Sequence, residues 1–156
     1  MDETPRTRIM GLDIGLKRTG ISLSDETRLI ASPLEVLEHP PGKKWAQKIK
    51  DLAEAHEASE IVVGLPLDHN GEVGQDGENI RKFIALLREA VSIPVIEWDE
   101  RFTTAQAERV LLGGDVSRKG RKAVIDKVAA SIILQGYLDS LRFQKSLEKT
   151  EWNDED

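Results

Sequence analysis

The chain has 156 residues, of which 39% are hydrophobic, and this length suits one domain with one hydrophobic core. Its 22 basic and 28 acidic side chains give a formal net charge of −6, and it contains no cysteine, which excludes disulfides, thiolate zinc sites and cysteine nucleophiles. No apolar run is long enough to span a membrane, and the first residues lack the core of a signal peptide. We therefore expect a cytoplasmic protein without membrane contact.

The charge is unevenly distributed along the chain. Segment 148–156 holds five acidic residues and one basic residue, whereas segment 101–127 holds seven basic and three acidic residues. Because exposed charges farther apart than about 10 Å are screened from each other, a polyanion would respond to the local positive balance. The net acidity therefore does not exclude nucleic acid as a partner. We expect a single domain over 1–147 and an acidic, disordered tail over 148–156.

Three strands are predicted at the start of the chain. Residues 8–13 form an apolar run, residues 20–25 alternate apolar and polar side chains, and a third run, 34–37, follows Pro33. No helical period separates the three runs. They are therefore expected to pair as an antiparallel meander of hairpins.

The rest of the chain alternates helical and strand patterns. We expect a helix from 45 to 56, a buried strand over 60–63, a helix over 80–91 and a strand over 94–98. A capping box at Thr103 and Gln106 predicts the start of a short helix, which ends at 113–114. A basic loop is expected over 115–121, followed by a long helix from 122 to about 147. This order predicts an α/β fold with a mixed sheet and helices on both faces.

Acidic residues stand at three places where a site could form. Asp13 ends the first strand, Asp99 and Glu100 follow the last strand, and Asp126 lies near the start of the long helix. Each position also has a purely structural explanation. Asp13 could cap its turn, the acids after the last strand could pair with Arg101 and introduce the next helix, and Asp126 could favour a helix start through the dipole.

Carboxylates from three distant segments would together make a hard oxygen cage, which Mg²⁺ and Mn²⁺ prefer. Two such ions can stabilise the attacking and leaving oxygens in phosphodiester hydrolysis. The three histidines are too scattered for a zinc site, and the chain has no P-loop, no Ser-His-Asp arrangement and no dinucleotide fingerprint. A two-metal site for phosphodiester chemistry is therefore the sharpest interpretation of these acids.

Basic residues provide candidate phosphate contacts. Lys17 and Arg18 follow Asp13 within the predicted turn, where they could neutralise a phosphate or simply form a solvated hairpin tip. The glycine-containing basic segment is expected to bind phosphates as a group. The candidate nucleic-acid-binding residues are Lys17, Arg18, Arg101, Arg118, Lys119, Arg121 and Lys122.

Four ordered blocks carry a resemblance to a known family. They are GLDIGLKRTGISLSD at 11–25, IVVGLPL at 61–67 followed by Gly71, DERFTT at 99–104, and DKVAA at 126–130 with ILQGYL at 133–138. Together they resemble the YqgF/RuvX family of Holliday-junction resolvase-like proteins, which have an RNase H-like fold. The resemblance implies a cytoplasmic nuclease that matures the 5′ end of the small-subunit ribosomal RNA precursor or cleaves branched DNA. It also implies that Asp13, Glu100 and Asp126 are the catalytic, metal-binding acids.

Two positions depart from the family pattern. Asp68 and Asn70 follow the second block in the reverse of the usual order, and Phe102 replaces the usual leucine. Because RNase H-like enzymes generally take their second acid from the strand beside the first, Asp68 competes with Glu100 as a metal ligand. Side chains alternate along a strand, so only one of Asp99 and Glu100 is expected to face the site.

Rival functions remain open from the residues alone. A domain of the actin and sugar-kinase type also starts with Asp-x-Gly, but such proteins need two domains to enclose a nucleotide. A receiver-like module would place a helix after its first strand, and a non-catalytic nucleic-acid-binding module would not need all three acids. The residues do not rank RNA against DNA. They allow a monomer or a homodimer, and cleavage of a two-fold junction would favour the dimer.

Overall fold

The computed structural model describes residues 7–68, 70–100 and 118–154, and in the last segment the side chains of 127–145 and 147. Its five strands form one sheet in the order β3-β2-β1-β4-β5. They are β1 (Arg8–Ile14), β2 (Thr19–Ser24), β3 (Ala31–Leu37), β4 (Ala58–Leu65) and β5 (Val95–Asp99). The first three strands pair antiparallel, and β4 and β5 run parallel to β1, so the predicted meander and mixed sheet are confirmed.

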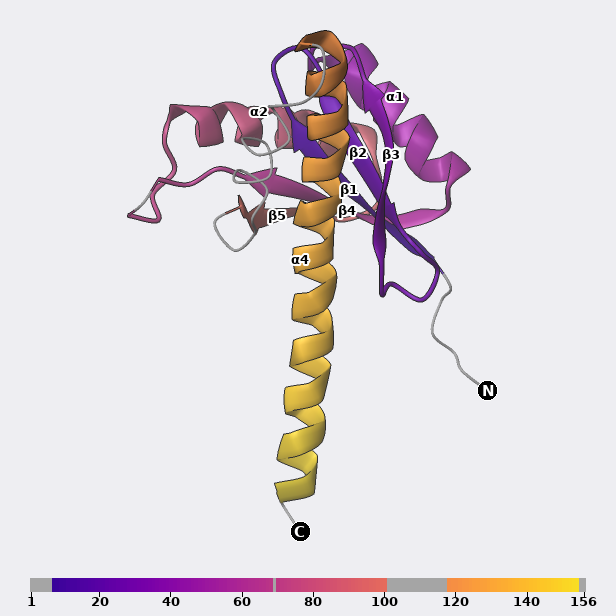
Figure 1. Cartoon of the computed structure of the whole chain (residues 1–156), viewed down its shortest axis with the longest axis vertical. Coiled ribbons are helices and arrows are strands. Elements are labelled where there is room, and N and C mark those ends of the chain that lie inside the picture. Colours follow the sequence, from indigo (N-terminus) through magenta and orange to yellow (C-terminus); the bar gives the residue numbers. More distant parts are fainter. Residues whose placement is uncertain (1–6, 69, 101–117, 155–156) are drawn as a thin grey trace.

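Helices cover both faces of the sheet, as the sequence predicts. Helices α1 (Lys43–Ala55) and α2 (Gln75–Ala90) pack on one face, and α4 (Arg118–Asp154) crosses β1, β2 and β3 on the other. Figure 1 shows that the second half of α4 extends well beyond the sheet as a single rod.

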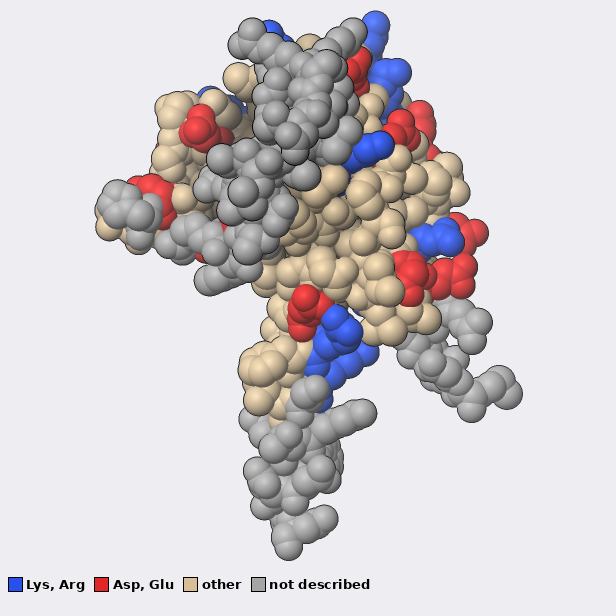
Figure 2. Space-filling model, in the orientation of Figure 1, with Lys and Arg blue, Asp and Glu red and all other residues tan. Residues whose placement is uncertain are grey.

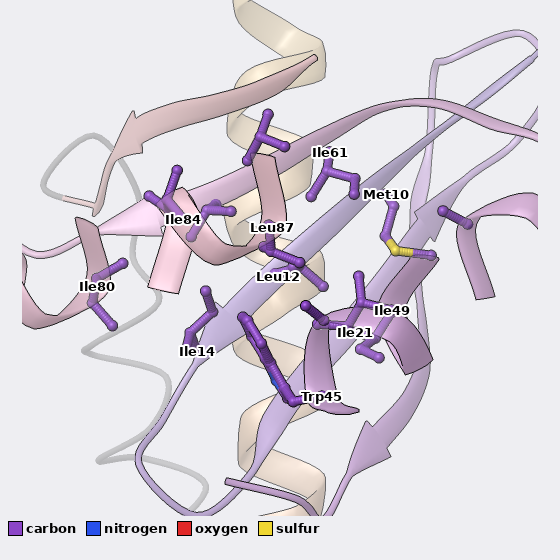
Figure 3. Packing of buried hydrophobic residues seen from close by; sticks show 14 of the residues in the cluster. Met10, Leu12, Ile14, Ile21, Trp45, Ile49, Ile61, Ile80, Ile84 and Leu87 are labelled. Atoms are coloured by element: carbon purple, nitrogen blue, oxygen red, sulfur yellow. The ribbon is translucent and has the colours of Figure 1, made fainter. Parts of the chain in front are cut away.

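The face covered by α1 and α2 carries the larger hydrophobic core (Figure 3). Trp45 of α1 is fully buried, and its indole N–H donates a hydrogen bond of 2.9 Å to the Thr19 hydroxyl of β2. Ile80 and Ile84 of α2 complete this face, because the apolar side chains of α2 recur every three to four residues along its buried side.

The face covered by α4 depends on small residues. A Cβ atom built on Gly11 of β1 would lie 2.7 Å from the Leu134 Cβ and 3.1 Å from the Ala130 carbonyl oxygen. The Ser22 hydroxyl of β2 donates a hydrogen bond of 2.8 Å to that same carbonyl. Helix α4 therefore rests directly on the backbone of β1, and the hydrogen bond from Ser22 is one of several polar contacts that hold its register.

A polar and aromatic cluster attaches α4 to the start of β4. The Tyr137 hydroxyl donates a hydrogen bond of 2.7 Å to Glu60 Oε1, and its ring meets Trp98 of β5 edge-on at a centroid distance of 5.7 Å. Burial raises the pKa of Tyr137 above its usual value, and the hydrogen bond to Glu60 acts in the same direction. The phenol is therefore held in its neutral form.

Three predicted boundaries are wrong. Strand β3 starts at Ala31 and includes Pro33, which an edge strand tolerates because one side of its backbone has no strand partner. Helix α4 starts at Arg118, within the predicted basic loop, and continues past residue 147 to Asp154. Arginine and lysine are good helix formers, and α4 includes Gly120 although glycine costs about 1 kcal/mol in a helix. The short helix predicted over 103–113 lies outside the described residues.

Within the described part of the chain, no helix combines the length and apolar character that crossing a bilayer requires.

Candidate active site

Two of the predicted acids meet at the edge of the sheet where β1, β4 and β5 end. Asp13 is half-buried near the end of β1, and Glu100 follows β5 with only 6% of its surface exposed. Both side chains line one cavity of about 480 Å³. Strand ends that converge in this way commonly form the ligand site of an α/β sheet.

Gly64 of β4 makes room for the Glu100 side chain. A Cβ atom on Gly64 would lie 2.9 Å from Glu100 Oε1 and 2.6 Å from the Ile133 Cδ1 atom of α4. Because Gly64 has no side chain, the Glu100 side chain can pass over the end of β4 and reach the cavity. Glu100 lines the cavity and Asp99 does not, as the alternation of side chains along a strand predicts.

The turn between β1 and β2 brings cations to the same cavity. The backbone N–H of Gly15 donates a hydrogen bond of 2.9 Å to the Arg18 carbonyl, which closes the turn beside Asp13. Lys17 is exposed, Arg18 is half-buried, and both line the cavity. Of the candidate residues predicted from the sequence, the described structure thus brings together Asp13, Glu100, Lys17 and Arg18.

Helix α2 forms a second wall of the cavity that sequence reasoning missed. Asp76, Asn79, Ile80 and Phe83 line it. The helix can approach the end of β4 because a Cβ on Gly77 would lie 2.8 Å from the Pro66 carbonyl oxygen. A glycine inside a helical pattern often marks such a close approach, and Gly77 is the one signal that could have revealed this wall.

Asp68 organises its own loop. Its Oδ1 accepts hydrogen bonds from the backbone N–H groups of Asn70 and Glu72 at 2.8 and 2.9 Å. Asp68 is exposed and is not among the residues that line the cavity. This arrangement resembles an Asx turn, in which the carboxylate replaces a backbone acceptor.

The backbone of Asp126 lies on α4, and its side chain is outside the described set. The direction of α4 follows from two contacts: Tyr137 meets Glu60 at the start of β4, and Ile133 meets Gly64 at its end. Earlier residues of α4 therefore lie toward the strand ends. Asp126 precedes Ala130 by about one helical turn, and the Ala130 carbonyl oxygen faces Gly11 of β1. The backbone of Asp126 therefore lies beyond this contact in the direction of the strand ends.

Of the remaining basic candidates, Arg101 is outside the described residues. Arg118, Lys119, Arg121 and Lys122 lie in the first turns of α4, and only their backbone is described. In the view of Figure 2, the described acidic and basic side chains are interspersed and gather into no patch of a single sign. Among the described side chains, no group of three acidic, histidine or cysteine residues is close enough to hold a metal ion.

Comparison with known proteins identifies relatives over most of the chain. A family model described as "RuvX: Holliday junction resolvase" matches residues 7–140. A protein of Thermoanaerobacter pseudethanolicus named "Putative pre-16S rRNA nuclease" is 48% identical over 134 residues, which cover 85% of this chain and 96% of the relative. A Bacillus thuringiensis protein of the same name is 46% identical over 135 residues, with 85% and 98% covered.

Solved structures share the fold at low sequence identity. Thermus thermophilus RuvC in complex with a Holliday junction substrate matches with a TM-score of 0.55 and 14% identity, covering 86% of this chain and 96% of that one. Fowlpox virus resolvase in complex with Holliday junction DNA matches with a TM-score of 0.52 and 16% identity, covering 86% and 99%. The RNase H-like fold is therefore confirmed, and the chain belongs to the RuvX family.

Proposed function

We propose that this protein is a cytoplasmic, divalent-metal-dependent endonuclease that hydrolyses phosphodiester bonds at the cavity between β1, β5 and α2. The observation that carries the proposal is the presence of Asp13 and Glu100 on one cavity together with Lys17 and Arg18. Acids next to bases suit a polyanionic substrate whose phosphate reacts at a cation. The nuclease names of the relatives support the same activity.

The donor set described here fits a hard cation. Asp13 and Glu100 offer carboxylate oxygens on one wall, and Mg²⁺ or Mn²⁺ prefers such ligands. Asp126 is the proposed third ligand, because its backbone lies about one turn of α4 beyond Ala130 toward the strand ends. Asp68 is a weaker fourth candidate, because its Oδ1 already accepts hydrogen bonds within its own loop. Bound ions, as a pair in the full site, would activate the attacking water and stabilise charge on the phosphate oxygens.

The protein's own groups would position the substrate. Lys17 and Arg18 stand where they can bind the phosphate oxygens that flank the scissile bond. The low exposure of Glu100 keeps bulk water from its carboxylate, which strengthens electrostatic interactions there. In this arrangement the turn between β1 and β2 orients the phosphate and the ends of the strands supply negative charge.

The proposed substrate is the precursor of 16S ribosomal RNA, which the names of the relatives support, and the family resemblance points to its 5′ end. Branched DNA is the second candidate. The description of the family model favours it, and both solved structures reported above contain a Holliday junction. A resolvase would act as a homodimer on the two-fold junction, whereas RNA processing is compatible with a monomer.

The test compares cleavage of a labelled precursor RNA and a four-way DNA junction by purified protein, with Mg²⁺, with Mn²⁺ and with a chelator. We expect cleavage with either ion and none with the chelator. Asp13→Asn and Glu100→Gln should reduce cleavage to background while the protein stays folded. Glu54→Gln, an exposed acid of α1 far from the cavity, is the matched control and should keep wild-type activity. Full activity of Asp13→Asn would refute the proposed site.

The start of α4 is the proposed second phosphate-binding surface. If Arg118, Lys119, Arg121 and Lys122 contact phosphates, changing all four to alanine should flatten the dependence of log K on log[salt] by about 0.7 to 0.9 per lost contact. An unchanged slope would assign the phosphate contacts to another surface.

A further inference from the structure

The cavity is larger than a metal site and one phosphate require. Its volume of about 480 Å³ lies within the range of about 300–1,000 Å³ that is typical of pockets for whole small molecules. The turn between β1 and β2 and the acids occupy one side, and α2 forms the other. The nuclease function proposed above gives no role to the α2 wall, so this wall is available to contact a further part of the substrate.

The two walls differ in charge. Lys17 and Arg18 line one side of the cavity together with Asp13 and Glu100, whereas Asp76 in the first turn of α2 lines the other. A cation held by Asp13 and Glu100 would make the first wall positive, so that a phosphate would be attracted there and repelled by the carboxylate of the second wall. The α2 wall therefore suits the uncharged part of a nucleotide, which is its sugar and base.

The α2 wall offers both hydrogen-bond donors and acceptors to a hydroxyl group. The Asn79 Oδ1 accepts a hydrogen bond of 3.2 Å from Gln75 Nε2, and no described residue accepts one from its two amide N–H donors. Asp76 and Asn79 are three residues apart and thus neighbours on one helix face. A hydroxyl group placed there could accept from the Asn79 amide and donate to the Asp76 carboxylate.

Phe83 adds an apolar surface to the same wall. It is half-buried, and its ring packs edge-on against Trp45 at a centroid distance of 6.3 Å, so the core fixes its position. An aromatic ring held in this way can support a sugar or a base, and such stacking contributes about 1–3 kcal/mol per base in single-strand binding proteins.

We propose that the α2 wall binds the nucleoside next to the scissile phosphate and that Asn79 and Asp76 recognise its ribose 2′-hydroxyl. The inference rests on the proposed nuclease function and deepens it, because it makes RNA the preferred substrate class. A 2′-hydroxyl is both a donor and an acceptor, and it distinguishes RNA from DNA at a protein site.

The first test measures kcat/KM for the precursor RNA and for the same RNA with one 2′-deoxynucleotide beside the cleaved bond, placed in turn on each side. We expect the wild type to cleave one of the deoxy-substituted RNAs about tenfold less efficiently, as the loss of hydrogen bonds to a substrate hydroxyl predicts. Asn79→Ala and Asp76→Asn should bring this ratio close to one, mainly by losing activity on the all-ribose RNA.

Two exposed residues of α2 that do not line the cavity provide matched controls. Glu78→Gln makes the same charge change as Asp76→Asn in the same helix turn, and Lys82→Ala alters the outer surface. Both should keep the wild-type ratio. If Asn79→Ala instead loses kcat/KM equally on the all-ribose and the deoxy-substituted RNA, so that their ratio stays at the wild-type value, the proposal is overturned.

A binding measurement separates this inference from the nuclease proposal. Fluorescence anisotropy in EDTA compares a short labelled RNA with DNA of the same sequence, so that it requires no cleavage. Tighter binding of RNA than of DNA that disappears in Asn79→Ala would support the α2 wall even if the wild type cleaves nothing. Equal affinity of the wild type for RNA and DNA would overturn the inference while leaving the nuclease proposal intact.

Discussion

The two faces of the sheet differ in how closely a helix backbone approaches the strands. On the face of α1 and α2, large side chains such as Trp45, Ile49 and Leu87 are fully buried and fill the space between the layers. On the face of α4, Ile133, Leu134 and Leu138 are also fully buried, but Gly11 and Ala130 bring the helix backbone against the strand, and the cluster of described buried side chains is smaller. Among the described side chains, the first face holds the larger buried apolar cluster, whereas on the second face the helix backbone lies close to a strand.

This difference bears on the site, because each wall of the cavity depends on one of the two faces. The α2 wall is attached to the large core through Ile80 and Phe83. The proposed ligand Asp126 depends on the register of α4, which the contact between Ser22 and Ala130 helps to fix. Mutations on the two faces should therefore separate the stability of the fold from the geometry of the proposed metal site.

The largest effect on stability is expected for Trp45→Ala. Removing a fully buried aromatic side chain and its hydrogen bond to Thr19 should lower the free energy of unfolding by about 3–5 kcal/mol. Urea denaturation followed by circular dichroism measures this loss. Lys44→Ala, at an exposed neighbour, should change it by less than about 0.5 kcal/mol. A loss below 1 kcal/mol for Trp45→Ala would contradict the division between the faces.

Gly11→Ala is expected to harm activity more than stability. Its Cβ would lie 2.4 Å from the Ser22 Oγ and 2.7 Å from the Leu134 Cβ, so α4 must shift. Overpacking of this kind costs about 1–3 kcal/mol, and the shift should also move Asp126 and reduce nuclease activity in the folded variant. Gly42→Ala is the control, because no atom lies within 4 Å of its added Cβ. A folded Gly11→Ala protein with wild-type activity would argue against the role of α4 in the site.

The smallest effect is expected for Tyr137→Phe. Loss of the hydrogen bond to Glu60 should lower stability by about 1 kcal/mol at neutral pH. The pKa of Tyr137 is raised in the folded protein, so its contribution is complete below the unfolded pKa of about 10 and declines as the pH rises above that value. Urea midpoints of wild type and variant should converge at high pH. A constant difference up to pH 11 would contradict this assignment.

Much of the fold was predictable because strands and helices follow periodic patterns. Asp13 and one of the pair Asp99 and Glu100 were predictable as candidate site residues because each stands at the end of an apolar run, where parallel strands bring their ends together. The choice of Glu100 rested on the resemblance to the family. The path of the Glu100 side chain over Gly64 could not be predicted, because a glycine in a strand does not indicate which side chain will occupy the space beside it.

The α2 wall illustrates what a single sequence conceals. Asn79 and Phe83 occupy ordinary positions of an amphipathic helix, and only the packing of that helix turns them toward the cavity. The predicted start of α4, residue 122, lies four residues after the observed start at Arg118. Glycine and clustered charges are typical of loops, but the arginines and lysines in this segment also favour a helix.

The contact between Ser22 and Ala130 joins residues that are 108 positions apart. Closing so long a segment is entropically costly and slows folding. During synthesis the hairpins, α1, α2 and β5 leave the ribosome before α4, so the larger core can assemble first. The acid carried by α4 then reaches the sheet edge last. A chain synthesised only through β5 would therefore hold the rest of the proposed site and lack its third acid, which would keep it inactive until α4 has also been synthesised.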